Sequence, residues 1–189
     1  MIHNRSYEIM KVFLRGYFGK IYGRGIIEEV SYSSKNISLI LKDLEKEGIL
    51  KFEISGNRKY YSLNLDNSLI NFELGIFEDL RRLEFFQKNK KFLDFLSGIN
   101  AQIVCVFGSY AKERNVKGSD LDLFVVGKVD VNRISKLGKD IGINVQVFNI
   151  SFKDFVKSVK GEIVKEVLKN HVIIKGGDLF IKEILKWEK

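Results

Sequence analysis

The spacing of apolar residues changes near residue 100, and this change limits the folds that the chain can adopt. Before it, apolar residues recur every three or four positions, as in "SSKNISLILKDLEKEG" (33–48), which is typical of amphipathic helices. After it, runs such as "AQIVCVF" (101–107) and "INVQVFNI" (143–150) predict strands, with helical segments between them. Strands that alternate with helices indicate an α/β or α+β domain. We therefore expect two domains, a mainly α domain followed by an α/β (α+β) domain with a small mixed sheet.

The first 67 residues predict three helices followed by a β-hairpin. The helices are expected over 5–16, over 24–30 and from the serines at 33 and 34 to Gly48. The strands "ILKFEI" (49–54) and "KYYSLNL" (59–65) are separated by a loop with Gly-Asn turn chemistry. This order of elements, together with the passage "LKDLEKEGIL…GNRKYYSLN", resembles the winged helix-turn-helix family.

That resemblance implies that residues 1–67 bind double-stranded DNA. A winged helix places its recognition helix in the major groove, while the wing contacts the backbone. The DNA-contacting residues that the resemblance implies lie on the recognition helix and at the wing tip: Ser34, Lys35, Asn36, Ser38, Lys42, Arg58 and Lys59. The same helix carries Asp43, Glu45 and Glu47, and a domain that contacts proteins is the alternative.

Residues 68–99 are expected to form a helical linker between the domains. Their apolar side chains fall on helical faces: Leu69, Phe72, Ile76, Leu80 and Leu83, then Phe92, Phe95, Leu96 and Ile99. One interpretation is a connecting helix that packs on one or both domains. The other is a dimerisation helix, which would make the protein a homodimer.

Gly108 and Ser109 follow directly on the predicted strand 101–107, where the chain must turn. Glycine lets a backbone approach a ligand closely, and a turn or helix that starts at Ser109 would aim backbone N–H groups and a hydroxyl at an anion such as phosphate. Taken by itself, a strand followed by Gly-Ser is usually only a turn.

Asp120 and Asp122 lie two positions apart at the start of the next predicted strand. Side chains alternate along a strand, so both carboxylates face the same side, while Leu121 and Leu123 face the core. Two neighbouring carboxylates repel each other unless a cation lies between them, and Mg²⁺ is the natural candidate. The alternative is that Asp120 caps a turn and Asp122 is solvated at the strand end.

The two pairs together are far more specific, because ten residues separate Ser109 from Asp120 and each pair adjoins a strand. The pattern G-S-x10-D-x-D in "FGSYAKERNVKGSDLDLFVV" resembles the DNA polymerase β-type nucleotidyltransferases, in particular the minimal nucleotidyltransferases. The resemblance covers roughly residues 100–178 of an expected domain over 100–189. It implies that Gly108 and Ser109 hold nucleotide phosphates. It also implies that Asp120 and Asp122 are catalytic and bind Mg²⁺, while a nucleoside monophosphate is transferred and pyrophosphate leaves.

One position departs from the family pattern. The family has a third carboxylate on a neighbouring strand, and in "INVQVFNI" this position falls on Asn144 or Gln146, neither of which is acidic. The nearest acids in sequence, Asp140 and Asp154, are expected on flanking helices and not in the site. Two hypotheses follow: an active enzyme that relies on two carboxylates, or a domain that keeps binding or only the fold without turnover.

Composition adds only weak constraints. The net charge of +8 is compatible with a polyanionic partner, and equally with general solubility. The single cysteine, Cys105, cannot form an intramolecular disulfide, which suits a reducing, cytoplasmic location. The sequence contains no apolar run long enough for a membrane span, and its start shows no secretory signal, so no membrane partner is expected.

The resemblances together imply an antitoxin-like regulator. Small nucleotidyltransferases of this kind are often antitoxins that transfer AMP from ATP to a partner toxin, typically a helical protein. A fused winged helix would allow the same chain to repress its own operon. The alternative is a catalytically inactive transcription regulator whose second domain senses a nucleotide or dimerises. Transfer to a small molecule such as an aminoglycoside would need a substrate domain that the sequence does not show.

Overall fold

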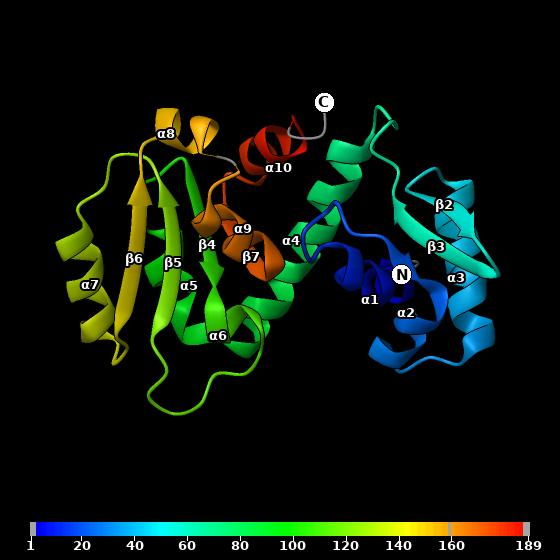
Figure 1. Ribbon diagram of the computed structural model, residues 1–189. Coiled ribbons are helices and arrows are strands. Elements are labelled where there is room, and N and C mark those ends of the chain that lie inside the picture. Colours follow the sequence, from blue (N-terminus) through cyan, green and yellow to red (C-terminus); the bar gives the residue numbers. More distant parts are fainter. Residues whose placement is uncertain (1–2, 159, 187–189) are drawn as a thin grey trace. The chain divides into compact units, whose positions relative to one another are not determined.

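The computed structural model describes residues 3–158 and 160–186, and the chain divides into two compact units between Phe77 and Glu78 (Figure 1). The division falls inside the longest helix, α4 (Ile70–Lys88). Within the described ranges, no helix combines the length and the apolar character that crossing a membrane requires. The predicted domain boundaries at 67/68 and 99/100 stay predictions.

The first unit contains the three predicted helices, the predicted hairpin and one short strand that the sequence analysis missed. Its elements are α1 (His3–Phe13), β1 (Ile21–Tyr22), α2 (Gly23–Glu29), α3 (Ser34–Lys46), β2 (Leu50–Ser55) and β3 (Arg58–Leu63). The strands form an antiparallel sheet in the order β1-β3-β2. Since β1 is only two residues long, no alternation of apolar residues could reveal it.

Both ends of α3 are fixed by polar contacts. The Ser33 side chain accepts a hydrogen bond from the backbone N–H of Asn36 at 3.4 Å, so Ser33 and not Ser34 is the N-cap. At the other end Gly48 adopts φ +74, and its carbonyl accepts hydrogen bonds from the side chains of Asn64 and Asn67. These bonds attach the end of α3 to the chain that follows the hairpin.

The second unit is built on a four-stranded sheet in the order β6-β5-β4-β7. Its elements after α4 are a 3₁₀ helix η1 (Lys90–Phe92), α5 (Leu93–Ser97), β4 (Ile103–Phe107), α6 (Gly108–Ala111), β5 (Leu121–Val126), α7 (Val131–Asp140), β6 (Val145–Ile150), α8 (Phe152–Lys157), α9 (Glu162–Lys169), β7 (His171–Lys175) and α10 (Gly177–Leu185). Strand β4 is antiparallel to β5 and β7, whereas β5 and β6 are parallel. The prediction of a small mixed sheet with helices is therefore confirmed.

The stretch 68–99 is mainly helical, but it is not one helix, because α4 stops at Lys88 and a second helical stretch begins after Asn89. Asn89 leaves the helical conformation, with φ −129 and ψ 49, and its side-chain amide donates to the carbonyl of Phe85. The break redirects the chain so that Phe92 is completely buried. Burial of this ring outweighs the gain from continuing the helix.

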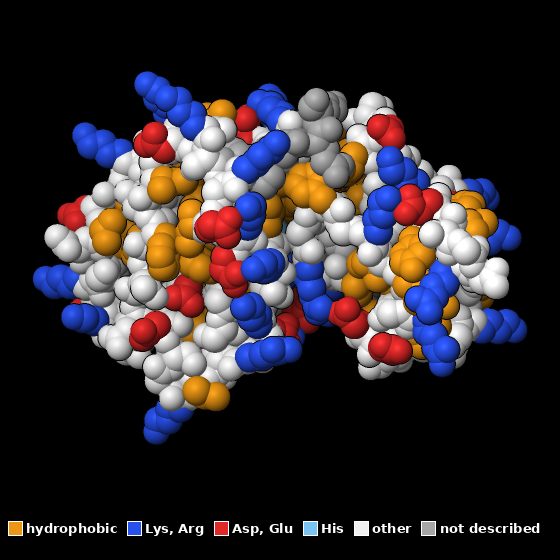
Figure 2. All heavy atoms as spheres, in the orientation of Figure 1, with side chains coloured by type: hydrophobic (Ala, Val, Ile, Leu, Met, Phe, Trp, Pro, Cys, Tyr) orange, Lys and Arg blue, Asp and Glu red, His pale blue; other side chains and the backbone are white. Residues whose placement is uncertain are grey.

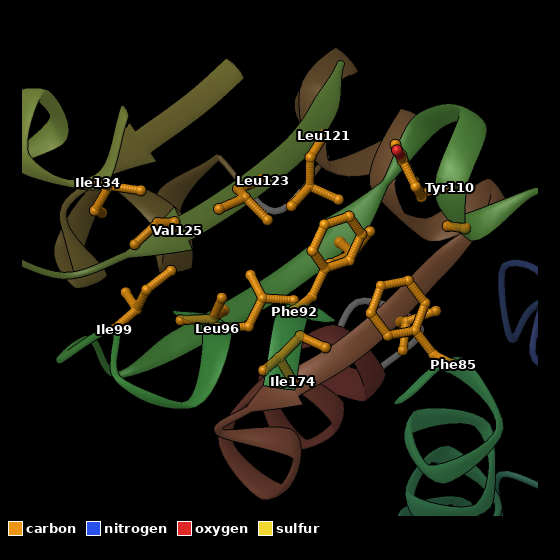
Figure 3. Packing of buried hydrophobic residues seen from close by; sticks show 14 of the residues in the cluster. Phe85, Phe92, Leu96, Ile99, Tyr110, Leu121, Leu123, Val125, Ile134 and Ile174 are labelled. Atoms are coloured by element: carbon orange, nitrogen blue, oxygen red, sulfur yellow. The ribbon is translucent and has the colours of Figure 1, made fainter. Parts of the chain in front are cut away.

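One face of the sheet carries an apolar core (Figure 3). It is made of side chains from the strands and from the helices that cover this face: Phe85, Phe92, Leu96, Ile99, Val104, Val106, Tyr110, Ala111, Leu121, Leu123, Val125, Ile134, Ile143, Val172 and Ile174. Phe92 occupies its centre, with its ring centroid 6.3 Å from that of Phe85 and 5.4 Å from that of Tyr110. The segment before β4 is thus an integral part of the second unit.

The opposite face of the sheet is covered by aromatic side chains from α8 and α10. Phe155 of α8 lies between Phe124 of β5 and Phe180 of α10, with ring centroids about 6 Å apart in each pair. His171 of β7 is completely buried beside Phe180, and its Nε2 lies 3.3 Å from Oε1 of the buried Glu78. Alternation along the strands therefore leaves two differently packed faces.

We predict that Phe92→Ala lowers the stability of the second unit by about 3–5 kcal/mol, because it leaves a cavity between α4, η1 and the sheet. Leu93→Ala is the matched control, since that neighbouring side chain is 46% exposed and should cost much less. Native-state hydrogen exchange of the β4 amides measures the free energy of unfolding of the second unit separately from that of the first. Equal losses for the two variants would contradict the central position of Phe92.

Candidate active site

The glycine-serine turn joins β4 to the single helical turn α6. Gly108 follows Phe107, adopts φ +67, and accepts a hydrogen bond from the backbone N–H of Lys112 at 3.1 Å. A Cβ atom at Gly108 would overlap Oδ2 of Asp122 and lie 2.9 Å from its Cγ. A side chain at Gly108 is therefore excluded twice, by the left-handed backbone and by the carboxylate that fills the space.

Four side chains lie in one row across the sheet at this end. In the strand register, Phe107 pairs with Asp122 on one side and with His171 on the other, and Asp122 pairs with Gln146 of the parallel strand β6. Side chains of paired residues project on the same face of a sheet. Gln146 is thus the neighbour of Asp122 on the adjacent strand.

Asn144 lies differently from Gln146, although the sequence analysis considered both for the third-carboxylate position. It precedes β6, and its backbone carbonyl accepts a hydrogen bond from the N–H of Leu121 at 2.9 Å. This bond extends the pairing of β5 and β6 by one step. The register therefore selects Gln146, and not Asn144, as the residue beside Asp122.

The surroundings of Asp122 disfavour the ionised form of its carboxyl group. Partial burial raises the pKa of Asp122, and the nearby charge of Asp120 raises it further, while Lys112 opposes both effects. A folded-state pKa above the unfolded value means that ionised Asp122 costs stability at neutral pH, and that this cost is relieved as the pH falls through the folded pKa. A bound cation would remove the same cost at neutral pH.

Lys112 is a contributor to this site that the sequence analysis did not name. It directly follows α6, and its Nζ lies 3.4 Å from Oε1 of Glu166 on α9. The sequence could have indicated this role, because Lys112 follows Gly108 by four positions and one helical turn places such residues side by side. The carboxylate pair therefore has one nearby lysine that partly balances its charge.

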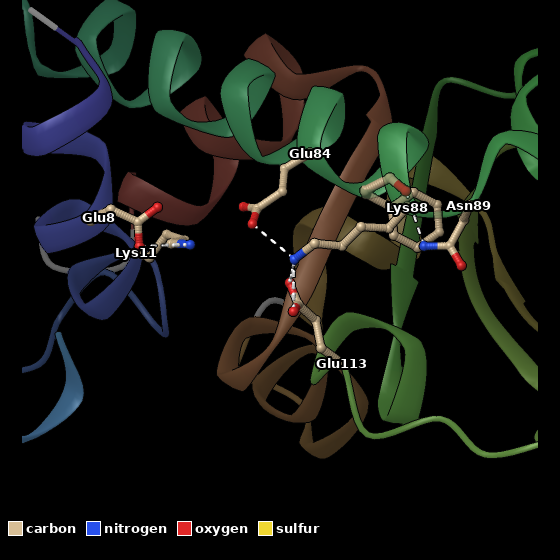
Figure 4. A network of polar contacts seen from close by, with 7 residues as sticks. Glu8, Lys11, Glu84, Lys88, Asn89 and Glu113 are labelled. Atoms are coloured by element: carbon tan, nitrogen blue, oxygen red, sulfur yellow. Dashed lines mark hydrogen bonds and ion pairs between the residues drawn. The ribbon is translucent and has the colours of Figure 1, made fainter. Parts of the chain in front are cut away.

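The segment between the two motifs is held by its own hydrogen bonds. The N–H of Arg114 donates to the carbonyl of Ser109 at 2.9 Å, and the N–H of Val116 donates to the Ser119 hydroxyl at 2.9 Å. Glu113 accepts from Lys88 at 2.8 Å, and Lys88 also contacts Glu84 (Figure 4). The ten residues between Ser109 and Asp120 thus form a supported loop anchored to α4.

Asp120 and Asp122 can supply two ligands to a divalent cation, but the described residues place no third acidic ligand beside them. Asp120 is exposed and Asp122 half-buried, and two carboxylates suffice for Mg²⁺ when substrate phosphates and water complete its coordination. Across residues 3–158 and 160–186, no group of three or more His, Cys, Asp or Glu side chains is arranged to hold a metal ion. Asp154, one of the two acids nearest in sequence to the position of the third carboxylate, accepts a hydrogen bond from the Ser151 hydroxyl at 2.6 Å.

The residues predicted to contact DNA lie in the first unit, on α3 and at the start of β3. The α3 residues of this set and Arg58 are exposed. Lys59 is instead half-buried, with its Nζ 3.0 Å from Oε2 of Glu45 and 3.5 Å from the centroid of the Phe52 ring. Burial lowers the pKa of Lys59, but the hydrogen bonds to Glu45 and Tyr61 together with the charges of these two residues raise it by more, so the pKa lies above its usual value. Lys59 is therefore less available to a phosphate than Arg58.

The mixed sheet with its helices is compatible with a nucleotidyltransferase domain. The family model of the nucleotidyltransferase domain matches residues 86–186, which is more than half of the chain, and the protein belongs to this family. No curated protein and no solved structure matches the chain. The matched region starts inside α4 and includes the whole four-stranded sheet, so the family assignment supports nucleotidyl transfer in general.

We predict that Gly108→Ala destabilises the second unit by roughly 1–3 kcal/mol more than Gly118→Ala. Both glycines have positive φ, at +67 and +91, but a Cβ at Gly118 would meet no atom within 4 Å. The difference between the variants therefore isolates the overlap with Asp122. Hydrogen exchange of the β5 amides provides the measurement, and equal destabilisation would show that Asp122 does not fill the space at Gly108.

Proposed function

We propose that the second unit transfers AMP from ATP to a hydroxyl group of a partner protein, with Mg²⁺ bound by Asp120 and Asp122. The observation that carries this proposal is the carboxylate of Asp122 packed on the side-chain-free face of Gly108. This arrangement brings the turn that would hold phosphates into contact with a residue that would hold the metal. Membership of the nucleotidyltransferase family supports the general reaction.

The roles of the residues follow from their chemistry. Gly108 and Ser109 offer backbone N–H groups and one hydroxyl to the phosphates of ATP. In the reaction, the acceptor oxygen forms a bond to the α-phosphorus, the bond to the β-phosphate oxygen breaks, and pyrophosphate leaves. Mg²⁺, when bound, stabilises the negative charge on the attacking and leaving oxygens. In the absence of the cation, the positive charge of Lys112 partly balances the two ionised carboxylates.

Gln146 favours a second candidate function. A glutamine beside Asp122 can offer a carbonyl oxygen, but it carries no negative charge and cannot accept the proton of an attacking hydroxyl. That proton must then go to water or to a group of the partner. The competing proposal is therefore a regulator that binds a nucleotide at this site without turnover.

For the first unit we propose a winged helix-turn-helix that binds double-stranded DNA. Its support is the order of elements, the antiparallel sheet β1-β3-β2 and the exposed polar side chains of α3. Combined with nucleotidyl transfer, this gives an antitoxin-like regulator whose partner is a helical, toxin-like protein. In the competing proposal, the same DNA-binding unit is controlled by nucleotide binding.

We predict that Asp120→Asn and Asp122→Asn each reduce Mg²⁺-dependent pyrophosphate release by at least about 100-fold, because each removes charge that positions the cation. Asp140→Asn, a change at the exposed end of α7, is the matched control and should leave the rate unchanged. Gln146→Glu should raise the rate, since it adds a carboxylate beside Asp122. The assay uses labelled ATP, CTP, GTP and UTP with the co-purified partner as acceptor.

The outcomes separate the two proposals. Label on the partner together with pyrophosphate release supports the transferase. Binding of Mg²⁺ and ATP with no pyrophosphate from the natural chain, but with pyrophosphate from Gln146→Glu, supports the nucleotide-binding regulator. Pyrophosphate release that survives both asparagine substitutions would contradict the assignment of this site.

We predict that the chain shifts duplex DNA in a salt-dependent manner, and that Arg58→Ala weakens binding more than Lys59→Ala. Arg58 is exposed, whereas Lys59 already contacts Glu45. Loss of one phosphate contact should reduce the slope of log affinity against log salt by about one. Lys51→Ala on the same hairpin is the control, because Lys51 is 2.9 Å from Asp66. Salt-independent binding, or no binding, would contradict the proposal.

A further inference from the structure

A cavity of about 560 Å³ lies in the second unit beside the loop that joins the two motifs. Its lining includes Tyr110 and Ile143, which belong to the apolar core on one face of the sheet. Asp122 alternates with the core residues Leu121 and Leu123 and so projects from the opposite face. The lining of the cavity contains neither Asp120 nor Asp122, although Ser119 in this lining directly precedes Asp120.

Three lysines from three separate segments line this cavity. Lys91 comes from η1, Lys117 from the loop after α6, and Lys139 from the last turn of α7. The lining contains no Asp or Glu, and among the residues that the structure describes none of the three lysines forms an ion pair with a carboxylate. The cavity therefore gathers positive charge that the protein itself does not neutralise.

This charge pattern differs from its surroundings. A second cavity of about 550 Å³ in the same unit is lined by both acidic and basic residues: Asp94, Asp130, Asp140, Lys128 and Arg133. On the face of the molecule shown in Figure 2, Lys and Arg side chains are likewise interspersed with Asp and Glu. Since like charges repel, three lysines around one cavity without an acid favour a bound anion.

Neutral hydrogen-bonding groups complete the lining. Asn115 and Asn144 each bring a side-chain amide, and the Ser119 hydroxyl, which accepts from the N–H of Val116, keeps its own hydrogen for donation. Tyr110 is largely buried, and burial raises the pKa of its phenol, so it remains a hydrogen-bond donor at neutral pH. Ammonium, amide and hydroxyl donors together match the oxygens of a phosphate chain.

We propose that this cavity binds a small ligand that carries a di- or triphosphate group, without the help of Mg²⁺. A volume of about 560 Å³ falls within the range of small-ligand pockets, whereas an extended nucleic-acid strand needs a long groove or a stripe of charge. Three ammonium groups balance most of the charge of pyrophosphate or tripolyphosphate. This inference does not depend on the proposed transfer reaction, because the lining contains none of Gly108, Ser109, Asp120 and Asp122.

The test uses the full chain carrying Asp120→Asn and Asp122→Asn, so that the carboxylate site cannot hold a metal-bound nucleotide. Inorganic tripolyphosphate and pyrophosphate are titrated calorimetrically in the presence of EDTA. We expect Lys91→Ala, Lys117→Ala and Lys139→Ala each to weaken binding about tenfold, the loss of one charge-assisted hydrogen bond. Lys136→Ala, an exposed change one turn earlier on α7, is the matched control and should have no effect.

Three results would overturn the proposal. The first is no binding of either polyphosphate to the doubly substituted chain. The second is an equal loss for Lys136→Ala, which would indicate general attraction to a basic protein. The third is lysine-dependent binding of a single-stranded RNA oligonucleotide without binding of tripolyphosphate, which would assign the surface to nucleic acid. Because the carboxylates are already substituted, none of these results bears on nucleotidyl transfer.

Discussion

The candidate site depends on the contact between the carboxylate of Asp122 and the side-chain-free face of Gly108. Gly108 terminates a buried strand in a left-handed conformation, and the carboxylate occupies the space of a Cβ atom. This contact fixes the end of β4 against the start of β5 and brings the glycine-serine turn to the acidic pair. The core beneath, centred on Phe92, holds the strands at the register that makes the contact possible.

The ionised form of Asp122 costs stability at this site. Asp122 is ionised less readily than a free carboxylate because it is partly buried near Asp120, and only Lys112 opposes that effect. Proteins commonly give up stability in this way where a ligand is to be bound. Because Gln146 beside Asp122 is neutral, only two carboxylates repel each other at this site. In the proposed function, the same glutamine cannot accept the proton of the attacking hydroxyl, which is the reason for considering nucleotide binding without turnover.

Local patterns in the sequence predicted most of the fold's elements but not their long-range arrangement. The hairpin turn and the two motifs depend on neighbours within a few positions, and spacing revealed them, while the cap of α3 was narrowed to Ser33 or Ser34. The break at Asn89 could not be predicted, because it reflects burial of Phe92 against strands far along the chain. The choice of Gln146 over Asn144 likewise required the register of β5 against β6, which no local pattern contains.

The central claim is that Gly108, Asp120 and Asp122 form one nucleotide and metal site. A crystal structure of the chain with ATP and Mg²⁺ tests this most directly, through the distances from the metal to the carboxylate oxygens. The account predicts distances of about 2.0–2.1 Å to Asp120 and Asp122, with phosphate oxygens of ATP completing the coordination next to Gly108 and Ser109. A metal-nucleotide complex bound elsewhere, with both carboxylates free of the metal, would contradict it.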